Sequence, residues 1–204
     1  MTTTIGMGLP GVTMATGDHI CAFYRGTAQR DDVLVPYLRE GLLAGDKCIC
    51  VMDDPDAERV VGLLAAQVDA DRSLRTGQFE LMRSEATYLA GGYFAIEEMI
   101  EFWERGVSGA LAEGAFEFVR AVGEMTWALR DLPGVEHLVA YEAQLNQFLP
   151  RYPQVVLCLY DLEKFSNGQV LIDLLRTHPK VLFGATLIDN PYFLTPDEYR
   201  ATRS

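Results

Sequence analysis

The sequence predicts an α/β fold in which a mostly parallel central sheet lies between two layers of helices. Apolar strand-like segments alternate with helix-like segments along most of the chain. Several of these strand-like segments are nearly continuous apolar runs, which is typical of parallel strands covered on both faces. Since a helix separates consecutive strands, right-handed βαβ crossovers and a three-layer sandwich are expected.

Six segments have the composition of strands. They are rich in Val, Ile, Leu, Cys and aromatic residues, and most are bounded by Gly, Pro, Asp or Asn. The expected strands are residues 19–24, 47–53, 79–84, 116–122, 155–161 and 181–187.

Helices are expected between these strands. The first is expected to begin at Asp31 or Asp32, either of which can cap it, and to end just before Gly45. Pro36 then falls in the first turn, where the missing N–H costs little. The later helices are expected to begin with Asp54 and Pro55, to span residues 93–112, to follow Gly134, to begin near Asn167, and to be capped by Thr195.

Composition and charge exclude some functions. The chain has 204 residues, of which 49% are apolar and 23% are charged, as in a globular protein. Its formal net charge of −12 repels nucleic-acid backbones and anionic lipids, so we expect no direct nucleic-acid binding and no membrane binding. No apolar run reaches the roughly 18–20 residues that a membrane span requires.

The N-terminal residues and the cysteines bear on organisation and compartment. Residues 1–16 contain no basic segment and no long apolar run, and we expect a flexible tail before one domain that spans residues 17–204. All four cysteines lie inside apolar strand-like segments, which favours buried free thiols over disulfides. Because free thiols are typical of a reducing compartment, we expect a cytoplasmic protein.

Polar residues gather where the predicted strands end. In an open α/β sheet, the ligand crevice lies beyond the carboxyl ends of the strands. The residues at these ends include Tyr24, Arg25, Asp53, Glu124 and Asp161. Because clustered carboxylates must be solvated, paired or partly protonated, they predict a polar ligand-binding pocket. Solvated loop acids and helix caps are the alternative explanation.

Aromatic and polar side chains extend this predicted pocket. Trp127 follows Glu124 after the fourth predicted strand, and Glu142 shares one face of the next helix with Asn146. We expect Trp127 and Glu142 to line the same cavity as Glu124. The alternative is an amphipathic helix with a partly solvated edge.

The segment between Tyr24 and Leu34 occupies the place of a phosphate-binding loop. It contains one glycine, Gly26, and no Gly-Lys-Ser/Thr sequence. A phosphate cradle needs glycines whose backbone N–H groups wrap the phosphates and a lysine for the β- and γ-phosphates. We therefore expect no ordinary ATP site, assign no cofactor, and interpret residues 25–32 as a loop that a ligand shifts.

No metal site is assigned from the sequence. His19 and Cys21 lie on one face of a predicted strand, with Cα atoms about 7 Å apart, and Cys48 and Cys50 form a similar pair. Four such ligands can bind zinc, but the spacing is not that of a zinc knuckle or ribbon. Packed core residues are the favoured explanation. If a metal binds, His19 with Cys21 is the favoured pair.

Several short motifs together resemble one family. They are HICAFY at residues 19–24, GEMTW at 123–127, YEAQLN at 141–146, THP at 177–179 and NPYF at 190–193. In this order they resemble the MEDS (methanogen/methylotroph, DcmR sensory) domain family over nearly the whole chain. The segment LREGLLAGDKCICVMDDP is also similar to RecA/KaiC-type ATPases, which implies a RecA/KaiC-like form of the predicted fold.

The resemblance implies a sensory function. MEDS domains are proposed to sense simple hydrocarbon derivatives and occur beside kinases and transcription regulators, and the His and Cys suspected in ligand or metal binding match His19 and Cys21. We therefore expect a non-catalytic domain that binds a small molecule and relays the signal to a partner regulator or kinase, or through its own homo-oligomer.

Two other functions stay open at this stage. The first is a divergent ATPase-like nucleotide hydrolase, in which Asp53 or Asp54 activates water and Asp161, after the apolar run VVLCLY, holds Mg²⁺. The second is a pure protein-interaction module in an anti-sigma-factor or kinase circuit, with an exposed apolar patch around Tyr192, Phe193 and Tyr199.

Overall fold

The computed structural model describes residues 4–53, 56–112 and 114–202. Its main feature is a seven-stranded sheet with the order β5-β4-β6-β7-β3-β8-β9. Neighbouring strands are parallel except for the antiparallel pair β8 and β9. The strands are β3 (His19–Tyr24), β4 (Lys47–Met52), β5 (Phe79–Arg83), β6 (Val119–Glu124), β7 (Gln154–Asp161), β8 (Lys180–Phe183) and β9 (Thr186–Asp189).

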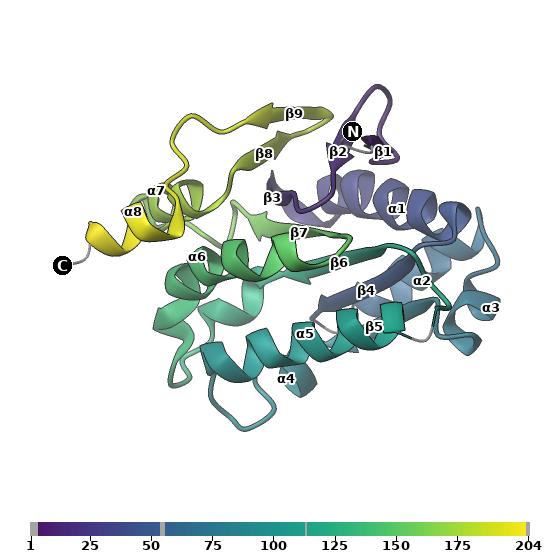
Figure 1. The fold of residues 1–204 in the computed structure, drawn as a ribbon, viewed down its shortest axis with the longest axis horizontal. Helices are drawn as coiled ribbons and strands as arrows, with labels where there is room; N and C mark the ends of the chain where they lie inside the picture. The colour runs from purple at the N-terminus through teal and green to yellow at the C-terminus, as the bar shows by residue number, and fades with distance from the viewer. Residues whose placement is uncertain (1–3, 54–55, 113, 203–204) are drawn as a thin grey trace.

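Helices cover both faces of this sheet, so the predicted three-layer α/β sandwich is confirmed (Figure 1). One face carries α1 (Gly26–Ala44), α2 (Asp56–Ala65) and α3 (Ala70–Arg75), and the other carries α5 (Ile96–Ala112), α6 (Leu138–Phe148) and α7 (Gly168–Thr177). The short helices are α4 (Ser84–Thr87), α8 (Pro196–Ala201) and the 3₁₀ turns η1 (Met125–Leu129), η2 (Val135–His137) and η3 (Leu149–Arg151).

Strand β4 shows why the strands read as continuous apolar runs. Cys48, Cys50 and Met52 pack in the core under α1 and α2. Ile49 and Val51 point the other way, into the core under α5 and α6. Successive side chains of a strand alternate between faces, so a strand with helices on both sides needs apolar residues at every position.

Residues 26–32, expected to form a loop in the place of a phosphate-binding loop, are helical. β3 ends at Tyr24, and α1 begins at Gly26 with Arg25 as its N-cap. The expected cap at Asp31 or Asp32 is wrong, because the Gln29 side chain accepts a 2.9 Å hydrogen bond from the Arg25 N–H and closes an earlier turn. Pro36 consequently lies inside the helix. The expected end is confirmed, since Gly45 caps α1 with a φ of 85°.

The N-terminal residues 4–16 are not the flexible tail that composition suggested. β1 (Thr4–Gly6) and β2 (Thr13–Ala15) pair as an antiparallel hairpin. Met7, Val12 and Met14 are buried in the same core as α1. The loss of apolar surface from water at these three residues holds the hairpin against the domain.

Element boundaries differ from expectation mainly near the C-terminus. The strand expected at residues 181–187 is a hairpin of β8 and β9, which turns at Gly184 with a φ of 57°. The expected helix start near Asn167 and the expected cap at Thr195 are confirmed. Asp54 and Pro55, expected to start the second helix, lie outside the described residues. Among the described helices, none combines the length and apolar character needed to cross a membrane.

Candidate functional site

The carboxyl ends of the central strands bring five polar side chains together, called the crevice group here: Tyr24, Asp53, Glu124, Thr126 and Asp161. The Tyr24 hydroxyl donates a 2.8 Å hydrogen bond to Glu124 Oε1. The Thr126 hydroxyl donates a 2.6 Å hydrogen bond to Glu124 Oε2. Both carboxylate oxygens therefore have a donor, which makes burial of Glu124 tolerable.

Asp53 is held beside this pair by a cation. Arg130 Nη2 lies 3.1 Å from Asp53 Oδ1, and Thr126 Oγ1 lies 3.4 Å from Asp53 Oδ2. Sequence reasoning did not single out Arg130 or Thr126, because both lie in the irregular segment after β6. Arg120, another arginine of this region of the chain, lies near the amino end of β6, away from Asp53, and forms a 2.7 Å ion pair with Asp46.

The environment of Glu124 shifts its protonation. Burial raises the pKa of Glu124 above its ordinary value, and the Asp53 carboxylate acts in the same direction. Hydrogen bonds from Thr126 and Tyr24, and the charge of Lys164, oppose this shift only in part. Burial and the Glu124 carboxylate also raise the pKa of Tyr24, so its hydroxyl stays a donor at neutral pH.

Asp161 and Arg25 lie at the same edge of the sheet. Asp161 pairs in register with Tyr24, is buried, and accepts a 3.0 Å hydrogen bond from the Glu163 N–H. It therefore closes the turn after β7 as well as bordering the crevice. Arg25 is exposed at the start of α1.

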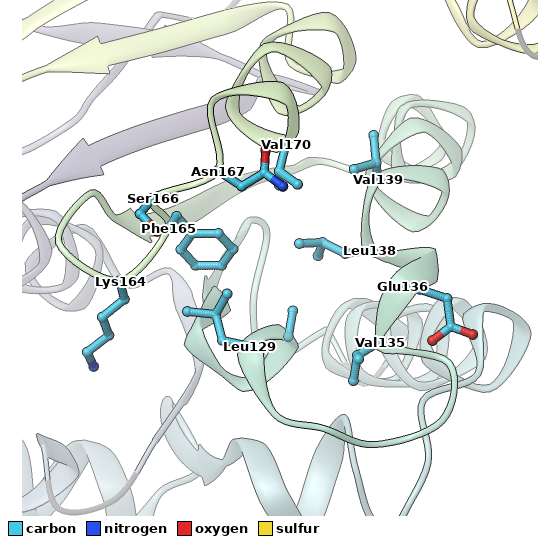
Figure 2. A pocket seen from close by; sticks show the side chains of 11 residues that line it. Leu129, Val135, Glu136, Leu138, Val139, Lys164, Phe165, Ser166, Asn167 and Val170 are labelled. Atoms are coloured by element: carbon cyan, nitrogen blue, oxygen red, sulfur yellow. The ribbon is translucent and has the colours of Figure 1, made fainter.

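A cavity of about 290 Å³ lies between η1, the start of α6 and the segment before α7 (Figure 2). Its lining is mostly apolar and includes Leu129, Val135, Leu138, Phe165 and Val170. The Phe165 N–H donates a 2.8 Å hydrogen bond to the Asp161 carbonyl, and the charge of Lys164 acts on Glu124. The turn at residues 161–165 therefore connects Asp161 of the crevice group to Lys164 and Phe165 of the cavity wall.

A second hollow of about 400 Å³ lies beside Tyr24. It is bordered by the first turns of α1, including Gln29 and Asp32, and by the β8–β9 turn at Gly184. Its lining is more polar than that of the cavity in Figure 2.

Trp127 and Glu142 are both buried in the core. Trp127 is fully buried and stacks on Tyr88, with ring centroids 4.4 Å apart, so it belongs to the aromatic core. Glu142 is also fully buried, because its face of α6 points toward the sheet rather than toward solvent. Neither residue lines the cavity of Figure 2, and their part in ligand binding stays a prediction.

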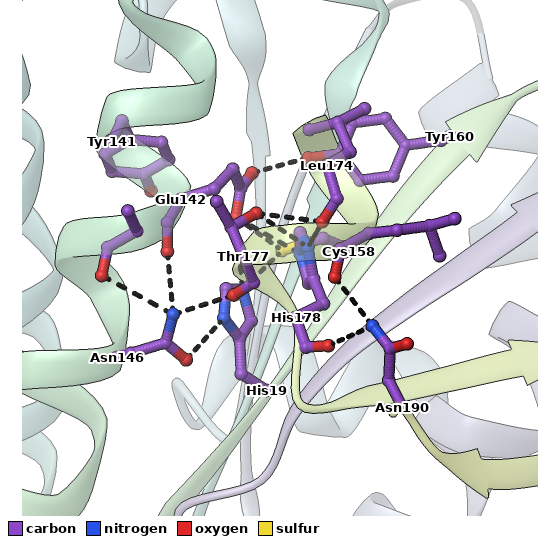
Figure 3. A network of polar contacts seen from close by, with 12 residues as sticks. His19, Tyr141, Glu142, Asn146, Cys158, Tyr160, Leu174, Thr177, His178 and Asn190 are labelled. Carbon is purple, nitrogen blue, oxygen red and sulfur yellow. Dashed lines mark hydrogen bonds and ion pairs between the residues drawn. The ribbon is translucent and has the colours of Figure 1, made fainter. Parts of the chain in front are cut away.

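Glu142 lies instead in a buried cluster with His19, Cys158 and His178 (Figure 3). Glu142 Oε2 is 3.1 Å from His19 Nε2 and 3.3 Å from His178 Nε2. Cys158 Sγ is 3.4 Å from His19 Nε2 and 3.6 Å from Glu142 Oε2. These four donor atoms all lie within 4.8 Å of one another, which makes the buried cluster the candidate metal-binding set among the described residues.

Surrounding residues fix the orientation of this cluster. His178 Nδ1 lies 2.8 Å from the Leu174 carbonyl, and His19 Nδ1 lies 3.1 Å from Asn146 Oδ1. The Asn146 amide is itself held by a 2.7 Å hydrogen bond to the Thr177 carbonyl. The Tyr160 hydroxyl donates a 2.6 Å hydrogen bond to Glu142 Oε1.

The protonation of the buried cluster follows from its enclosure. Burial alone would raise the pKa of Glu142, but the charges and hydrogen bonds of His178 and His19 outweigh it and hold that pKa below its ordinary value. Burial, and then the charge of His178, lower the pKa of His19. Burial and the Glu142 carboxylate raise the pKa of the Cys158 thiol.

Cys158, not Cys21, is the cysteine that meets His19. Cys21 is buried and pairs in register with Cys158 across β3 and β7. It lies two residues after His19 on the same face of β3, and it is not one of the four residues of the buried cluster. The pairing of His19 with Cys21 was predicted from their spacing along one strand. The actual partners come from β7, α6 and the residue after α7, so only the strand order could have revealed them.

Comparisons with known proteins decide the family. The family model described as "MEDS: MEthanogen/methylotroph, DcmR Sensory domain" matches residues 18–179. The chain belongs to the MEDS family. The transcriptional repressor DcmR of Methylorubrum extorquens is 34% identical to this MEDS chain over 173 residues, which cover 82% of the chain and 60% of the repressor. The chain thus spans less than two thirds of that relative's length, and the two matches together indicate a sensory or regulatory role.

Solved structures of other proteins show the same fold as this MEDS domain. A KaiC-like protein from Pyrococcus horikoshii superposes with a TM-score of 0.65 at 14% identity, covering 89% of this chain and 80% of that one. The flagellar accessory protein FlaH from Methanocaldococcus jannaschii gives a TM-score of 0.59 at 10% identity, covering 92% and 84%. At these identities the likeness shows the fold alone, and it confirms the expected KaiC-like form.

Proposed function

We propose that this MEDS domain is a non-catalytic sensor of a small, largely apolar molecule such as a simple hydrocarbon derivative. The observation that carries the proposal is the apolar cavity of about 290 Å³ at the carboxyl edge of the sheet. Ligand sites are typically concave and mostly apolar, with a few polar groups that fix orientation, and this cavity lies at the small end of their range of about 300–1,000 Å³. Its size therefore favours a ligand of few atoms.

The polar contacts in this proposal come from the crevice group. Asp161 connects to the cavity wall through its carbonyl, which accepts a hydrogen bond from the Phe165 N–H, and Asp53 is held by Arg130. Tyr24 and Glu124, which are hydrogen-bonded to each other, are further proposed contacts. Arg25, exposed at the start of α1, is a further proposed contact. In this proposal the apolar body of the ligand lies in the cavity and one polar end reaches toward these groups.

A ligand in this cavity would act on the segment of residues 161–167 and on α7. Phe165 lines the cavity and packs edge-on against Tyr160 at 5.2 Å between centroids. Binding shifts a conformational equilibrium only through different affinities for the two states, and a ring at the cavity wall that packs differently in the two states would supply such a difference. The relay to a partner regulator or kinase, in the cytoplasm where free thiols persist, belongs to the same proposal.

The nucleotide of RecA/KaiC-type ATPases does not fit the residues at this edge. α1 begins two residues after Tyr24, and no lysine lies between Tyr24 and Leu34. Asp53, Glu124 and Asp161 add negative charge where phosphates would lie. Calorimetry with Mg-ATP tests this argument directly, because micromolar binding that is lost in Asp161→Asn would favour the nucleotide-hydrolase alternative.

The test of the sensor proposal is thermal unfolding with a panel of one- to four-carbon alcohols, aldehydes and halogenated hydrocarbons. We expect at least one compound to raise Tm in a saturable manner. Val170→Trp, which fills the cavity, should abolish this increase. The control Leu43→Trp, at an exposed position of α1, should leave it unchanged. A panel without a saturable increase, or an increase that survives Val170→Trp, would reject the proposed site.

One observation favours the interaction-module alternative. Phe183, Ile188 and Tyr192 are 50%, 41% and 71% exposed on and after the β8–β9 hairpin at the sheet edge. Tyr199, expected in the same patch, is buried. If the chain acts only through a protein partner, Phe183→Ser with Ile188→Ser should abolish partner capture from the native host while no panel compound changes Tm.

A further inference from the structure

We propose that His19, Glu142, Cys158 and His178 bind one Zn²⁺ ion in the interior of the domain. The four side chains come from β3, α6, β7 and the residue that follows α7. The proposal concerns a site separate from the ligand cavity and does not depend on the sensor function.

The spacing of the donor atoms matches a tetrahedral zinc site. With Zn–N and Zn–O distances near 2.0–2.1 Å and Zn–S near 2.3 Å, the edges of a tetrahedron are about 3.3–3.6 Å. The distances from Glu142 Oε2 to the Nε2 atoms of His19 and His178 are 3.1 and 3.3 Å. Cys158 Sγ lies 3.4 Å from His19 Nε2 and 3.6 Å from Glu142 Oε2. An ion therefore fits with small side-chain adjustments.

The hydrogen bonds of both histidines turn a lone pair toward this centre. The Leu174 carbonyl can only accept, so the 2.8 Å contact assigns the proton of His178 to Nδ1. Asn146 Oδ1 is likewise an acceptor, because the Asn146 amide nitrogen donates to three carbonyls, and this assigns the His19 proton to Nδ1. In the neutral rings both Nε2 atoms are then unprotonated and face the Glu142 carboxylate.

A cation at the centre would satisfy this arrangement. His178 Nε2 is buried and has no hydrogen-bond partner, although Glu142 Oε2 is 3.3 Å away. Lone pairs that face a carboxylate repel it, and protons on both Nε2 atoms would put two buried positive rings with centroids 4.0 Å apart. One Zn²⁺ satisfies both nitrogens. Its charge is balanced by the Glu142 carboxylate and the Cys158 thiolate.

The outer contacts are those that metal ligands need. Metal-bound histidines usually donate the second ring N–H to a carbonyl or carboxylate, which orients the ring. Here the Leu174 carbonyl and Asn146 do so, and Tyr160 binds the carboxylate oxygen of Glu142 that faces away from the centre. The mixture of nitrogen, sulfur and one carboxylate favours Zn²⁺ over Mg²⁺ or Ca²⁺, which prefer all-oxygen sites.

The enclosure of the site points to a structural ion. All four ligands are at most 2% exposed, and four protein ligands complete a tetrahedron without an open position. The ion would join α6 and the end of α7 to β3 and β7. The first residues of the same two helices, such as Leu138 and Val170, line the cavity of Figure 2, so the ion would also fix the distance between two walls of that cavity.

The test is reconstitution of the full chain with Co²⁺, a spectroscopic substitute for Zn²⁺. Protein unfolded with a chelator and refolded with CoCl₂ should bind one equivalent, with the visible absorption of tetrahedral Co²⁺ and a thiolate-to-metal charge-transfer band. One equivalent of ZnCl₂ should remove both. Cys158→Ser should lose the charge-transfer band. Cys50→Ser, which changes a buried cysteine on the opposite face of the sheet, should keep it.

Three results would overturn the site. The first is wild-type protein that refolds, as judged by circular dichroism, but binds neither Co²⁺ nor Zn²⁺; this outcome needs no variant and decides the question even if Cys158→Ser fails to fold. The second is an unchanged charge-transfer band in Cys158→Ser. The third is a band that is lost in Cys21→Ser but not in Cys158→Ser, which would move the site to the other cysteine.

Discussion

The crevice group and the buried cluster place ionisable side chains in two different environments, one at the carboxyl edge of the sheet and one in the interior of the domain. At the carboxyl edge, Glu124 and Asp53 contact hydroxyls and a partly exposed arginine. In the interior, Glu142 is enclosed by two histidines and a cysteine with no exposed surface. The edge can exchange water for a ligand at low cost, whereas any change in the interior leaves a charge without a partner.

The largest effect is expected from Glu142→Ala. Removal of one partner from a buried ion-pair network costs about 3–5 kcal/mol of unfolding free energy, because the remaining polar groups stay buried. Urea unfolding measures this. Glu101→Ala is the matched control, since Glu101 is an exposed helical glutamate with an ion pair to Arg105, and it should cost about 0.3–0.5 kcal/mol. Equal losses in the two variants would contradict the contrast between interior and surface.

Tyr24→Phe tests the crevice group with a smaller change. The substitution removes the hydroxyl that donates to Glu124 Oε1 and should cost about 1–3 kcal/mol, because a buried carboxylate oxygen loses its donor. Tyr192→Phe, at a position that is 71% exposed, should leave the unfolding free energy almost unchanged. A loss below that of the control would show that Glu124 finds another donor.

Glu124→Gln should change how stability depends on pH. The folded-state pKa of Glu124 is raised, so the folded protein binds this proton more tightly than the unfolded chain does. Its contribution to stability is complete below the ordinary value of 4.5 and is lost as pH rises through the raised pKa. Wild-type protein should therefore lose stability relative to Glu124→Gln across this range. If the wild-type protein instead gained stability relative to Glu124→Gln as pH rises, the folded-state pKa of Glu124 would be lowered rather than raised.

The smallest effect on stability is expected from Arg130→Ala. The Arg130 side chain is 36% exposed, and a pair of this kind contributes about 0.2–1 kcal/mol. The same substitution should weaken ligand binding at the crevice more than it weakens folding, because it frees the Asp53 carboxylate. Calorimetry with the best panel compound, beside urea unfolding, separates the two effects. A loss of several kcal/mol would place Arg130 among the structural residues.

The sequence was sufficient for the fold because its signals are local. The apolar run of β4 and the cap at Gly45 each follow from a few neighbouring residues. The N-terminal hairpin was missed because its stability comes from Met7 and Met14 packing against distant helices rather than from local pattern.

The candidate site was predictable only at the strand ends. Tyr24 and Glu124 could be grouped because parallel strands end at one edge. The buried cluster could not be, since His19 and Cys158 are 139 positions apart and meet only because β3 pairs with β7. His178 carried no signal beyond its place at a helix end.

The most direct test of the account is methyl NMR of the full chain during titration with the best panel compound. We expect saturable shifts at the methyl groups of Leu129, Leu138 and Val170, which line the cavity. Leu64, in the opposite helical layer, should not move. Shifts confined to Leu64 and its neighbours, or no saturable shift with any panel compound, would contradict the claim that this edge of the sheet is the sensory site.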